Sequence, residues 1–394
     1  MPTAVIAGGG IAGMAAALGL AQAGWHVTVC ERADRLGEVG AGVQISPNAC
    51  KVLEWLGVLP ALSAHVFEPE AAVLRDGITG GQIYRAPLHS TGEWRWGGPY
   101  LHVHRADLHT VLADTARQSG VDIRLGTPVA RAVMRPENAG LHLESGEIIE
   151  ADLVLGADGI RSALRHGLAR DEEPRFTGQV AWRALVPVDT FPKDLVAPDA
   201  TVWAGHGRHL VTYYLRGGEM VNLVGVLEQD SWTAEGWSTK GDPRAFRAAF
   251  ADWHLDVGVL LEAVQECYLW GLFDRPEQVR WVKGRLALIG DAAHPMLPFM
   301  AQGAAQALED AAALVRHLAD PDIPRALESW EAERWPRATR ILQTARANGR
   351  MFHRAPGLAR TMSRLLMRTV TKIAPGVATG QLDWLYGFDP VKGH

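Results

Sequence analysis

Gly8-Gly9-Gly10-Ile11-Ala12-Gly13 stands between an apolar run, Thr3–Ala7, and an alanine-rich segment, Gly13–Ala23. This order predicts a strand, a tight turn and a helix, the context in which such a glycine pattern binds a dinucleotide. Gly8 permits the turn, Gly10 lets the backbone approach a phosphate, and Gly13 allows the helix to pack closely on the strand. The pattern alone is also compatible with a plain glycine turn, and it does not separate FAD from NAD.

An acid follows this unit at the distance that a ribose contact requires. His26–Glu31 reads as the second strand of a βαβ unit, and the carboxylate of Glu31 at its end can accept hydrogen bonds from a ribose hydroxyl. Arg32 comes directly after it. The strand, the helix and the acid together favour nucleotide binding over a structural turn.

Two more motifs follow predicted strands much further along the chain. Gly156-Ala-Asp158-Gly-Ile-Arg-Ser162 ends a predicted hairpin and strand, Leu141–Leu155, and Gly290-Asp291-Ala-Ala-His294-Pro295 ends the short apolar run Leu286–Ile289. Ligands bind at the carboxyl ends of strands in open α/β sheets, so Asp291 could hold a ribityl hydroxyl; its alternative role is to cap a helix. A dinucleotide lying along a groove needs contacts at its adenosine, pyrophosphate and ribityl parts. Three separated segments that supply them indicate a flavin.

The segment after Asp291 predicts a helix that begins beside the flavin ring. Gln302-Gly303 opens a helical pattern, Ala304–Leu318, after a loop that contains Pro295 and Pro298. The free amides of a helix N-terminus favour negative charge. Reduced flavin carries that charge at its N1–C2=O edge, so amides near Gly303 and Ala304 would make FAD easier to reduce.

Composition excludes several other classes of protein. The chain has 394 residues, 47% hydrophobic and 21% charged, with a net charge of −5 that argues against nucleic-acid binding. No apolar run reaches membrane-spanning length, and the first strand leaves no room for a signal peptide. Cys30, Cys50 and Cys267 lack metal-type spacing, so we expect no metal site and a reduced, cytoplasmic setting.

The order of the predicted elements indicates a discontinuous α/β fold. A Rossmann-type FAD-binding domain is expected over residues 1–75, 98–178 and 270–330, where strands and helices alternate. A β-rich substrate domain is expected over 76–97 and 179–269, since alternating segments with a Gly217-Gly218 hairpin run from Val180 to Leu227. Residues 331–394 are expected to form C-terminal helices. Between Arg334 and Lys372 these carry ten Arg or Lys and no acid, which favours a solvated positive face over a dimer, ligand or lipid surface.

These features together resemble the single-component, class A FAD-dependent aromatic hydroxylases, in particular the salicylate hydroxylase and 3-hydroxybenzoate 6-hydroxylase branch. The resemblance spans nearly the whole chain and implies the fold of para-hydroxybenzoate hydroxylase. The stretches that carry it, besides the three glycine motifs, are Gly40-Ala-Gly-Val-Gln44-Ile-Ser-Pro-Asn48, His104-Arg105-Ala-Asp-Leu108, Ala181-Trp-Arg-Ala184, Met300-Ala-Gln-Gly303 and Trp384-Leu-Tyr-Gly387.

The resemblance implies a set of cofactor contacts. Arg105 would contact the FAD phosphates or ribityl chain, Asp291 the ribityl hydroxyls, and Asp158–Arg161 both FAD and the nicotinamide donor. The loop Gly40–Gln44 would flank the isoalloxazine ring, and Pro295 would lie near the site of oxygen reaction. The complete expected cofactor-binding set is Gly8, Gly10, Gly13, Glu31, Arg32, Gln44, Arg105, Asp158, Asp291, Gly303 and Ala304. Relatives often have glycine in place of Ala301 and proline in place of Tyr214.

The resemblance also implies the reaction. FAD, bound tightly but not covalently, would be reduced by NADH or NADPH and react with O2 to a C4a-hydroperoxide, which attacks an electron-rich ring. A phenol reacts faster as its phenolate, so a base with a pKa near the working pH is expected, which favours histidine. The predicted strand that begins at His209 presents His209, Val211 and Tyr213 on one face.

His209 is therefore the expected base. It matches a histidine of the 3-hydroxybenzoate hydroxylases, in which Gln302 matches a second pocket residue; the alternative is a histidine hydrogen-bonded inside a sheet. Gln302 and Pro295 complete the expected catalytic set, and Val211, Tyr213 and Arg183 the substrate-binding set. Substrates of this branch usually carry a carboxylate, with which Arg183, Arg85 or Arg216 could pair; each is more often a surface or strand-end arginine.

We therefore expect a monooxygenase that hydroxylates a phenolic, carboxylated monocyclic aromatic, working as a monomer or homodimer. Other flavoenzymes of the same fold remain open, namely an N-heterocycle hydroxylase, an isoprenoid reductase or a halogenase, although nothing marks the halogenase lysine. A NAD-dependent dehydrogenase would leave Asp158 and Asp291 unexplained. A flavoprotein sensor without turnover is the remaining alternative.

Overall fold

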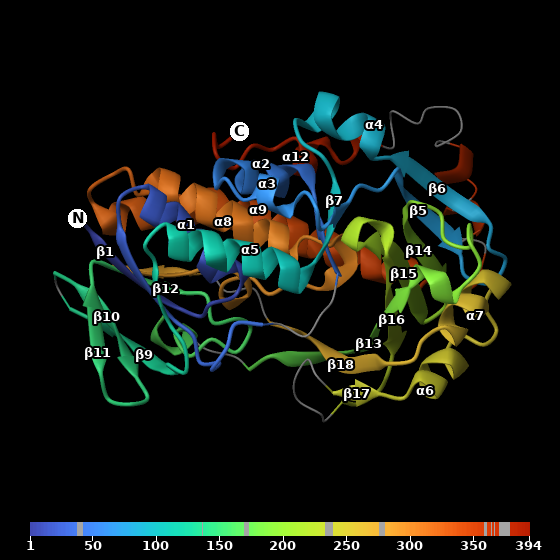
Figure 1. Ribbon diagram of the computed structural model, residues 1–394, viewed down its shortest axis with the longest axis horizontal. Helices are drawn as coiled ribbons and strands as arrows, with labels where there is room; N and C mark the ends of the chain where they lie inside the picture. The colour runs from blue at the N-terminus through green and yellow to red at the C-terminus, as the bar shows by residue number, and fades with distance from the viewer. Residues whose placement is uncertain are drawn as a thin grey trace.

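The computed structural model describes residues 1–37, 42–135, 137–168, 173–232, 239–275, 280–357, 361–363, 365, 367–369 and 379–394. Its long axis runs from a helix-covered parallel sheet at one end to a large, mainly antiparallel sheet at the other (Figure 1). This is the mixed α/β architecture that the sequence predicts.

The first sheet is parallel except at one edge. Its order is β19 (Val282–Lys283), β20 (Leu286–Leu288), β12 (Leu153–Gly156), β1 (Thr3–Ala7), β2 (His26–Cys30) and β8 (Asp122–Arg124), with β19 antiparallel to β20. The predicted βαβ start is confirmed by β1, α1 (Ile11–Gln22) and β2. Two small sheets accompany it, made of β11 (Ile148–Ala151), β10 (Ala139–Leu143) and β9 (Val129–Met134), and of β3 (Gly42–Ile45), β7 (Leu101–His104) and β4 (Val66–Phe67).

Helices cover the parallel sheet because its strands are apolar on both faces. Figure 1 shows α1, α5 (Arg105–Gln118) and α8 (Gly303–His317) running across it, with α2 (Pro47–Trp55) and α3 (Leu59–Leu62) beyond. The main core lies here; fully buried members include Val5, Ile6, Met14, Leu18, Leu155 and Leu308. Pro47 is at the first turn of α2, with Ser46 as its N-cap, a position that suits the fixed φ of proline.

The second large sheet has eight strands. Its order is β17 (Lys240–Gly241), β18 (Cys267–Asp274), β13 (Arg175–Pro187), β16 (Met220–Glu228), β15 (Arg208–Leu215), β14 (Ala200–Gly205), β5 (Ala71–Asp76) and β6 (Gln82–Pro87). The predicted hairpin at Gly217-Gly218 joins β15 to β16. Strands β5 and β18 lie partly outside the expected ranges 76–97 and 179–269. The sheet therefore includes residues before the first range and after the second.

The two faces of this sheet have different neighbours. One face packs on α6 (Pro243–Ala248) and α7 (Leu255–Glu262) through Trp182, Leu210, Leu223, Phe246 and Leu260. The other face, which carries Ala181, Val224, Val226 and Trp270, packs on Phe299 and Phe352 from the opposite end of the molecule. The face that carries Ala181, Val224, Val226 and Trp270 is therefore the one that faces the helix-covered domain.

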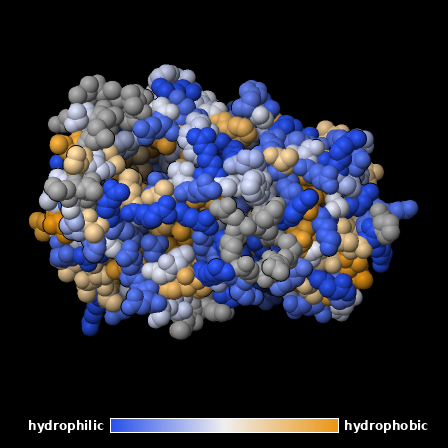
Figure 2. Space-filling view, turned by 180° about the vertical axis from the view of Figure 1, so that it is seen from behind, coloured by the Kyte–Doolittle hydropathy of each residue, from blue (hydrophilic) through white to orange (hydrophobic). Residues whose placement is uncertain are grey.

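The helix α9 (Ile323–Phe352) runs from the helix-covered domain to the eight-stranded sheet (Figure 1). The remaining helices are short, α4 (His89–Thr91) and α12 (Asp383–Tyr386). No helix in the described part of the chain is both long and apolar enough to cross a membrane. On the face seen in Figure 2, hydrophilic residues predominate and hydrophobic ones are scattered among them.

A fully buried charge network fixes α9 against α8. Arg334 on α9 bonds to Glu309 at 2.5 Å and Asp310 at 2.8 Å, and all three side chains have no exposed surface. Arg337 adds a bond of 2.7 Å to Glu309. Burial raises the pKa of Glu309, but Arg334 and Arg337 outweigh it and hold that pKa below its usual value. Part of the basic stretch therefore faces inward, which corrects the expectation of a solvated positive face.

Replacing Arg334 with Met should strongly destabilise the protein. The change leaves two carboxylates buried beside one fewer cation, and breaking a buried ion pair by removing one partner costs about 3–5 kcal/mol. Denaturant unfolding measures this loss. The exposed Arg350 on the same helix is the matched control, and Arg350→Met should change stability by less than about 0.5 kcal/mol. Equal stabilities of the two variants would contradict the assigned network.

Candidate functional site

The three sequence motifs meet at one edge of the parallel sheet. Strands β20, β12 and β1 are neighbours, so their carboxyl ends lie side by side. Ala157 donates to the carbonyl of Ala7 at 2.7 Å, and Ile289 donates to that of Gly156 at 2.9 Å. The turn after each strand therefore opens onto the same groove, where ligands of open α/β sheets bind.

The first turn has the shape that a phosphate contact requires. Gly8 has φ +98°, and a side chain there would come within 2.5 Å of the Ala157 carbonyl. A Cβ on Gly13 would overlap the carbonyl of Gly8. Gly10, by contrast, has open space around its missing side chain, although it is the N-cap of α1. This open side leaves room for an anion to approach the helix N-terminus.

Glu31 and Arg32 lie next to this turn. The carboxylate of Glu31 accepts from the amides of Gly9 at 2.7 Å and Ala33 at 2.9 Å, which fixes it at the groove. Arg32 is exposed. The acid thus supports the glycine turn directly and retains lone pairs for a ribose hydroxyl.

Asp158 carries an unsatisfied acceptor. One carboxylate oxygen accepts from the amide of Ala163 at 2.8 Å, whereas Oδ1 is buried and has no hydrogen-bond partner among the residues that the structure describes. Burial raises the pKa of this carboxyl group, and its bonds to Ser162 and nearby amides act in the opposite direction. An orphaned acceptor beside the glycine turn is a suitable partner for a cofactor hydroxyl. The residues at this edge therefore fit FAD.

Asp291 and Arg105 lie close enough for their charges to interact. Asp291 lies in the short turn η5 (Gly290–Ala292) and is exposed, and Arg105 is the first residue of α5. Enclosure by surrounding protein raises the pKa of Asp291, and Arg105 and then His294 lower it. The exposed carboxylate is free of internal capping bonds to other described residues, so its predicted alternative as a helix cap is not realised.

The start of α8 is bound to the start of α2. Gln302 donates to the hydroxyl of Ser46 at 2.9 Å and accepts from Asn48 at 3.3 Å, and it is buried. Gly303 and Ala304 follow in the first turn of α8, partly exposed. Ala301 has φ +52°, the left-handed region in which glycine is favoured.

His294 and Pro295 are both buried behind this turn. The Nε2 atom of His294 lies 2.6 Å from Asp310, whose same oxygen accepts from Gly290 at 2.9 Å. The charge network of α8 and α9 thus holds the turn that carries Asp291. His294 therefore helps to hold this turn in place.

The loop before α2 joins the groove to the eight-stranded sheet. Gly40 and Ala41 lie outside the described residues. Gly42 donates to the amide oxygen of Asn222 at 3.1 Å, and a side chain on Gly42 would come within 2.6 Å of the Tyr213 ring. Gln44 accepts from the hydroxyl of Tyr100 at 2.7 Å. The sheet face and the predicted flavin loop are therefore in direct contact.

The predicted substrate residues share that face, in adjacent rows across the sheet. His209 pairs with Val226, which pairs with Ala181; Val211, Val224 and Arg183 form the next row; Tyr213, Asn222 and Leu185 form the third. Residues paired across antiparallel strands point to the same side. The alternation predicted from sequence for His209, Val211 and Tyr213 is thus present in the structure.

His209 is enclosed by aromatic rings. It is 2% exposed, and the ring centroids of Phe299 and Phe352 lie 5.4 and 5.3 Å from its own. Its Nδ1 atom lies 2.7 Å from Nε2 of His353. Burial, and then the neighbouring His353, hold the pKa of His209 well below its usual value. The imidazole is therefore neutral near pH 7 and has one nitrogen, Nε2, left for a ligand.

Arg183 differs from the other two candidate arginines. Arg85 is paired with Asp199 and Glu70, and Arg216 lies 3.3 Å from Asp107. Among the described residues, Arg183 has no carboxylate partner; its guanidinium stacks 4.3 Å from the Trp270 ring and its Nε is unsatisfied. Burial lowers its pKa to about 10. This cation is the one of the three that is available to an anionic ligand.

Sequence reasoning missed four polar residues near this face. His102 is fully buried, its ring is 4.6 Å from that of Tyr213, and neither ring nitrogen has a partner among the described residues. Asn222 is buried with an unsatisfied Nδ2. His353 and Glu228 adjoin His209. The alternation of apolar and polar residues in β7 was the one sequence signal for His102. The positions of Asn222, His353 and Glu228 near this face depend on strand pairing and on the end of α9.

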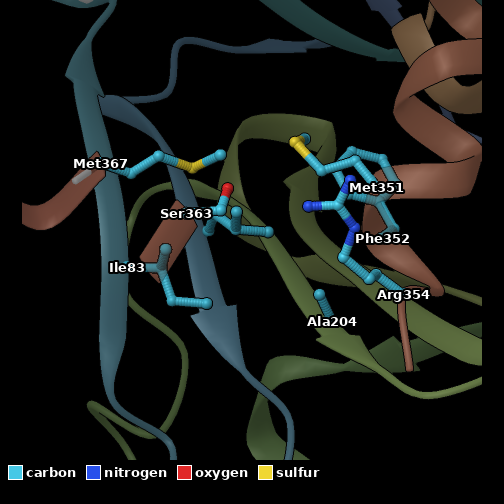
Figure 3. Close-up of a pocket in the computed structure, with 8 residues that line it drawn as sticks. Ile83, Ala204, Met351, Phe352, Arg354, Ser363 and Met367 are labelled. Atoms are coloured by element: carbon cyan, nitrogen blue, oxygen red, sulfur yellow. The ribbon is translucent and has the colours of Figure 1, made fainter. Parts of the chain in front are cut away.

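A small pocket lies beyond His209 and contains none of the predicted residues. Ile83 and Ala204 line it from the sheet, and Met351, Phe352 and Arg354 from the end of α9, with Ser363 and Met367 opposite (Figure 3). Ala204 pairs with His209 across the strands, and Phe352 contacts the His209 ring. The pocket therefore lies on the same face of the sheet as His209, and Phe352 contacts both.

Comparison with known proteins is consistent over the whole chain. The model of the FAD binding domain family matches residues 1–345. The chain is 38% identical to the 3-amino-4-hydroxybenzoate 2-monooxygenase of Streptomyces cremeus, over 97% of this chain and 94% of that protein. It is 35% identical to the 3-hydroxybenzoate 6-hydroxylase of Klebsiella oxytoca, over 98% and 96%. A salicylate hydroxylase substrate complex superposes with a TM-score of 0.84 at 25% identity, over 100% and 97% of the two chains.

The open space at Gly10 gives a direct test of the groove. Gly10→Val should fold as the parent does, because its φ is −73° and no atom lies within 4 Å of the added Cβ. The side chain would occupy the approach of a phosphate, so we expect at least a hundredfold weaker FAD binding in a fluorescence-quenching titration. Thermal unfolding without FAD is the control. Unchanged FAD affinity would show that the phosphate lies elsewhere.

Proposed function

The chain belongs to the FAD binding domain family, as an FAD-dependent aromatic hydroxylase, and we propose that its substrate is a six-membered aromatic ring bearing both a hydroxyl and a carboxylate group. NAD(P)H is the co-substrate typical of the family. One observation carries the proposal: His209 and Arg183 lie in neighbouring rows of one sheet face. The imidazole of His209 is neutral, and the guanidinium of Arg183 has no carboxylate partner among the described residues.

Arg183 supports the carboxylate. A guanidinium in a partly buried site without an acid loses solvation that nothing in the described protein restores, as the lowered pKa of about 10 reflects. An incoming carboxylate would restore it with charge-assisted hydrogen bonds. Arg85 and Arg216 already hold acids, so they have less to gain.

His209 supports the hydroxyl. Its Nδ1 atom is occupied by His353, which leaves Nε2 to accept a proton from a phenol. Between the two groups, Val211 and Val224 offer an apolar surface of the kind that a flat ring covers. Tyr213, which abuts Gly42, limits the face toward the flavin loop. We propose these residues as the substrate site.

The chemistry divides between cofactor and protein. FAD, when bound and reduced, supplies the electrons that activate O2. The protein orients the ring through Arg183, removes the phenolic proton through His209, and excludes water with Phe299 and Phe352. We propose that buried Pro295 and the first amides of α8, at Gly303 and Ala304, line the flavin side, with Gln302 holding that helix start on Ser46.

The names of the relatives support the same chemistry. The proteins from Streptomyces cremeus and Klebsiella oxytoca are named for 3-amino-4-hydroxybenzoate and 3-hydroxybenzoate. Both compounds are benzoates with a ring hydroxyl. Transferred to this chain, they favour a hydroxybenzoate, with or without an amino group.

The test is a panel of aromatic acids supplied to the FAD-loaded protein with NADH. We expect one or more hydroxybenzoates to accelerate NADH oxidation and oxygen uptake with formation of a hydroxylated product, identified by mass spectrometry. Arg183→Met should raise KM for that acid about 10- to 150-fold, the equivalent of ~1.5–3 kcal/mol for a charged hydrogen bond. The corresponding amide, such as 3-hydroxybenzamide, should show little change. An equal effect on acid and amide would remove the carboxylate role from Arg183.

His209→Ala should retain FAD and lose about 10²–10⁴ in the rate of hydroxylation, the usual contribution of a positioned base. Because burial depresses the pKa of His209, its neutral form persists below the usual histidine range. The kcat/KM of the parent should therefore not fall near pH 6.5 through protonation of His209, and His209→Ala should not change the shape of the pH profile there. Coupled hydroxylation at the parental rate in this variant would exclude His209 as the base.

A further inference from the structure

A continuous line of hydrogen-bonding side chains leads from His209 to the protein surface. Nδ1 of His209 lies 2.7 Å from Nε2 of His353, and Nδ1 of His353 lies 3.1 Å from Oε1 of Glu228. Exposure rises along this line: His209 is 2% and His353 6% exposed, whereas the Glu228 side chain is 58% exposed. The line therefore starts at the proposed substrate face and ends in solvent.

Three separate elements hold the three side chains in place. His209 is on β15 and Glu228 on the paired strand β16, whereas His353 caps the C-terminus of α9. The amide of Gly207 donates to the His353 carbonyl at 3.2 Å, which ties the helix end to the turn between β14 and β15. The backbone positions of all three residues are thus fixed by the fold.

The exposed carboxylate decides where the protons lie. Ionised Glu228 only accepts hydrogen bonds, so neutral His353 carries its proton on Nδ1 and presents a lone pair at Nε2. That lone pair accepts from Nδ1–H of His209, which leaves the Nε2 lone pair of His209 for the substrate. Gln179 offers a weaker, longer contact of 3.4 Å to the same nitrogen of His353. The other charged neighbour is His206, which is exposed and opposes protonation of His353.

We propose that His353 and Glu228 are positioning residues that set the tautomer of His209 and conduct its proton to solvent. The inference rests on the proposed role of His209 as the base. The phenolic proton passes to Nε2 of His209 as its Nδ1 proton passes to Nε2 of His353, and the Nδ1 proton of His353 passes to the Glu228 carboxylate. No charge then stays on the buried imidazole; the carboxyl group delivers its proton to water.

Burial explains why such a line is needed. The low pKa of His209 makes imidazolium costly in this site, with Phe299 and Phe352 against its ring. A lone buried histidine could accept the proton only by storing that charge. When His353 and Glu228 take part in the transfer, no positive charge stays on the His209 imidazole. The same steps in reverse return a proton to the product.

The first test needs no substrate. We expect ¹⁵N NMR of histidine-labelled, FAD-loaded protein to show both imidazoles neutral and protonated on Nδ1 at pH 7, assigned by the signals lost in His209→Asn and His353→Asn. A proton on Nε2 of His209 would overturn the inference. Glu228→Gln should keep the Nδ1–H tautomers, since the amide oxygen still accepts.

The second test measures proton transfer. With a hydroxybenzoate that gives turnover, proton release on binding to oxidised enzyme, followed with a pH indicator, should be at least tenfold slower in Glu228→Gln than in the parent, with unchanged FAD affinity. Glu219→Gln, another exposed acid of the same sheet region, is the control and should behave as the parent. Equal release rates in parent and Glu228→Gln would overturn the inference. If no hydroxybenzoate turns over, the proposed function fails, and the tautomers alone decide the inference.

Discussion

The adjacency of three parallel strands is the constraint on which the rest of this structure depends. Because β20, β12 and β1 are hydrogen-bonded neighbours, motifs separated by more than a hundred residues end at one edge. A single glycine turn can bind one phosphate; three adjoining turns can bind the length of FAD. The buried network of Glu309, Asp310 and Arg334 then secures that edge, since Asp310 also holds the turn containing Gly290.

The eight-stranded sheet completes the site by facing this edge. Tyr213 lies against Gly42, and Phe299, from the loop after Asp291, lies against His209. Contacts of this kind bring the candidate cofactor and substrate residues together. The sheet contributes an imidazole and, among the described residues, a guanidinium without an acid, and the proposed aromatic-acid site depends on these two groups.

Local sequence patterns predicted the parts of this arrangement that have local causes. The βαβ start, the hairpin at Gly217-Gly218 and the alternation of β15 follow from glycine positions and periodicity, and each is present. The inward-facing position of Arg334 and Arg337 was missed. A run of basic residues has the same sequence pattern whether it faces solvent or pairs with acidic residues on another helix. The choice of Arg183 over Arg85 and Arg216 likewise needed the positions of Asp199 and Asp107.

The link from His209 to Glu228 could not have been predicted either. His353 is 144 residues from His209 in the chain and follows a long helix whose end is set by packing. The family resemblance supplied His209 and Gln302 as candidates, but only the strand register and the helix end reveal what lies behind His209. Sequence thus supplied the candidates for ligand contact, and the structure revealed the side chains that pack behind them.

The central claim is that the aromatic acid lies between this sheet face and the flavin. Titration of the FAD-loaded protein with 3-hydroxybenzoate or 3-amino-4-hydroxybenzoate, followed by the visible absorption of the flavin, tests it most directly. The account predicts a saturable change in the flavin spectrum whose midpoint equals the affinity measured by calorimetry. Saturable binding in the calorimeter with an unchanged flavin spectrum would contradict it.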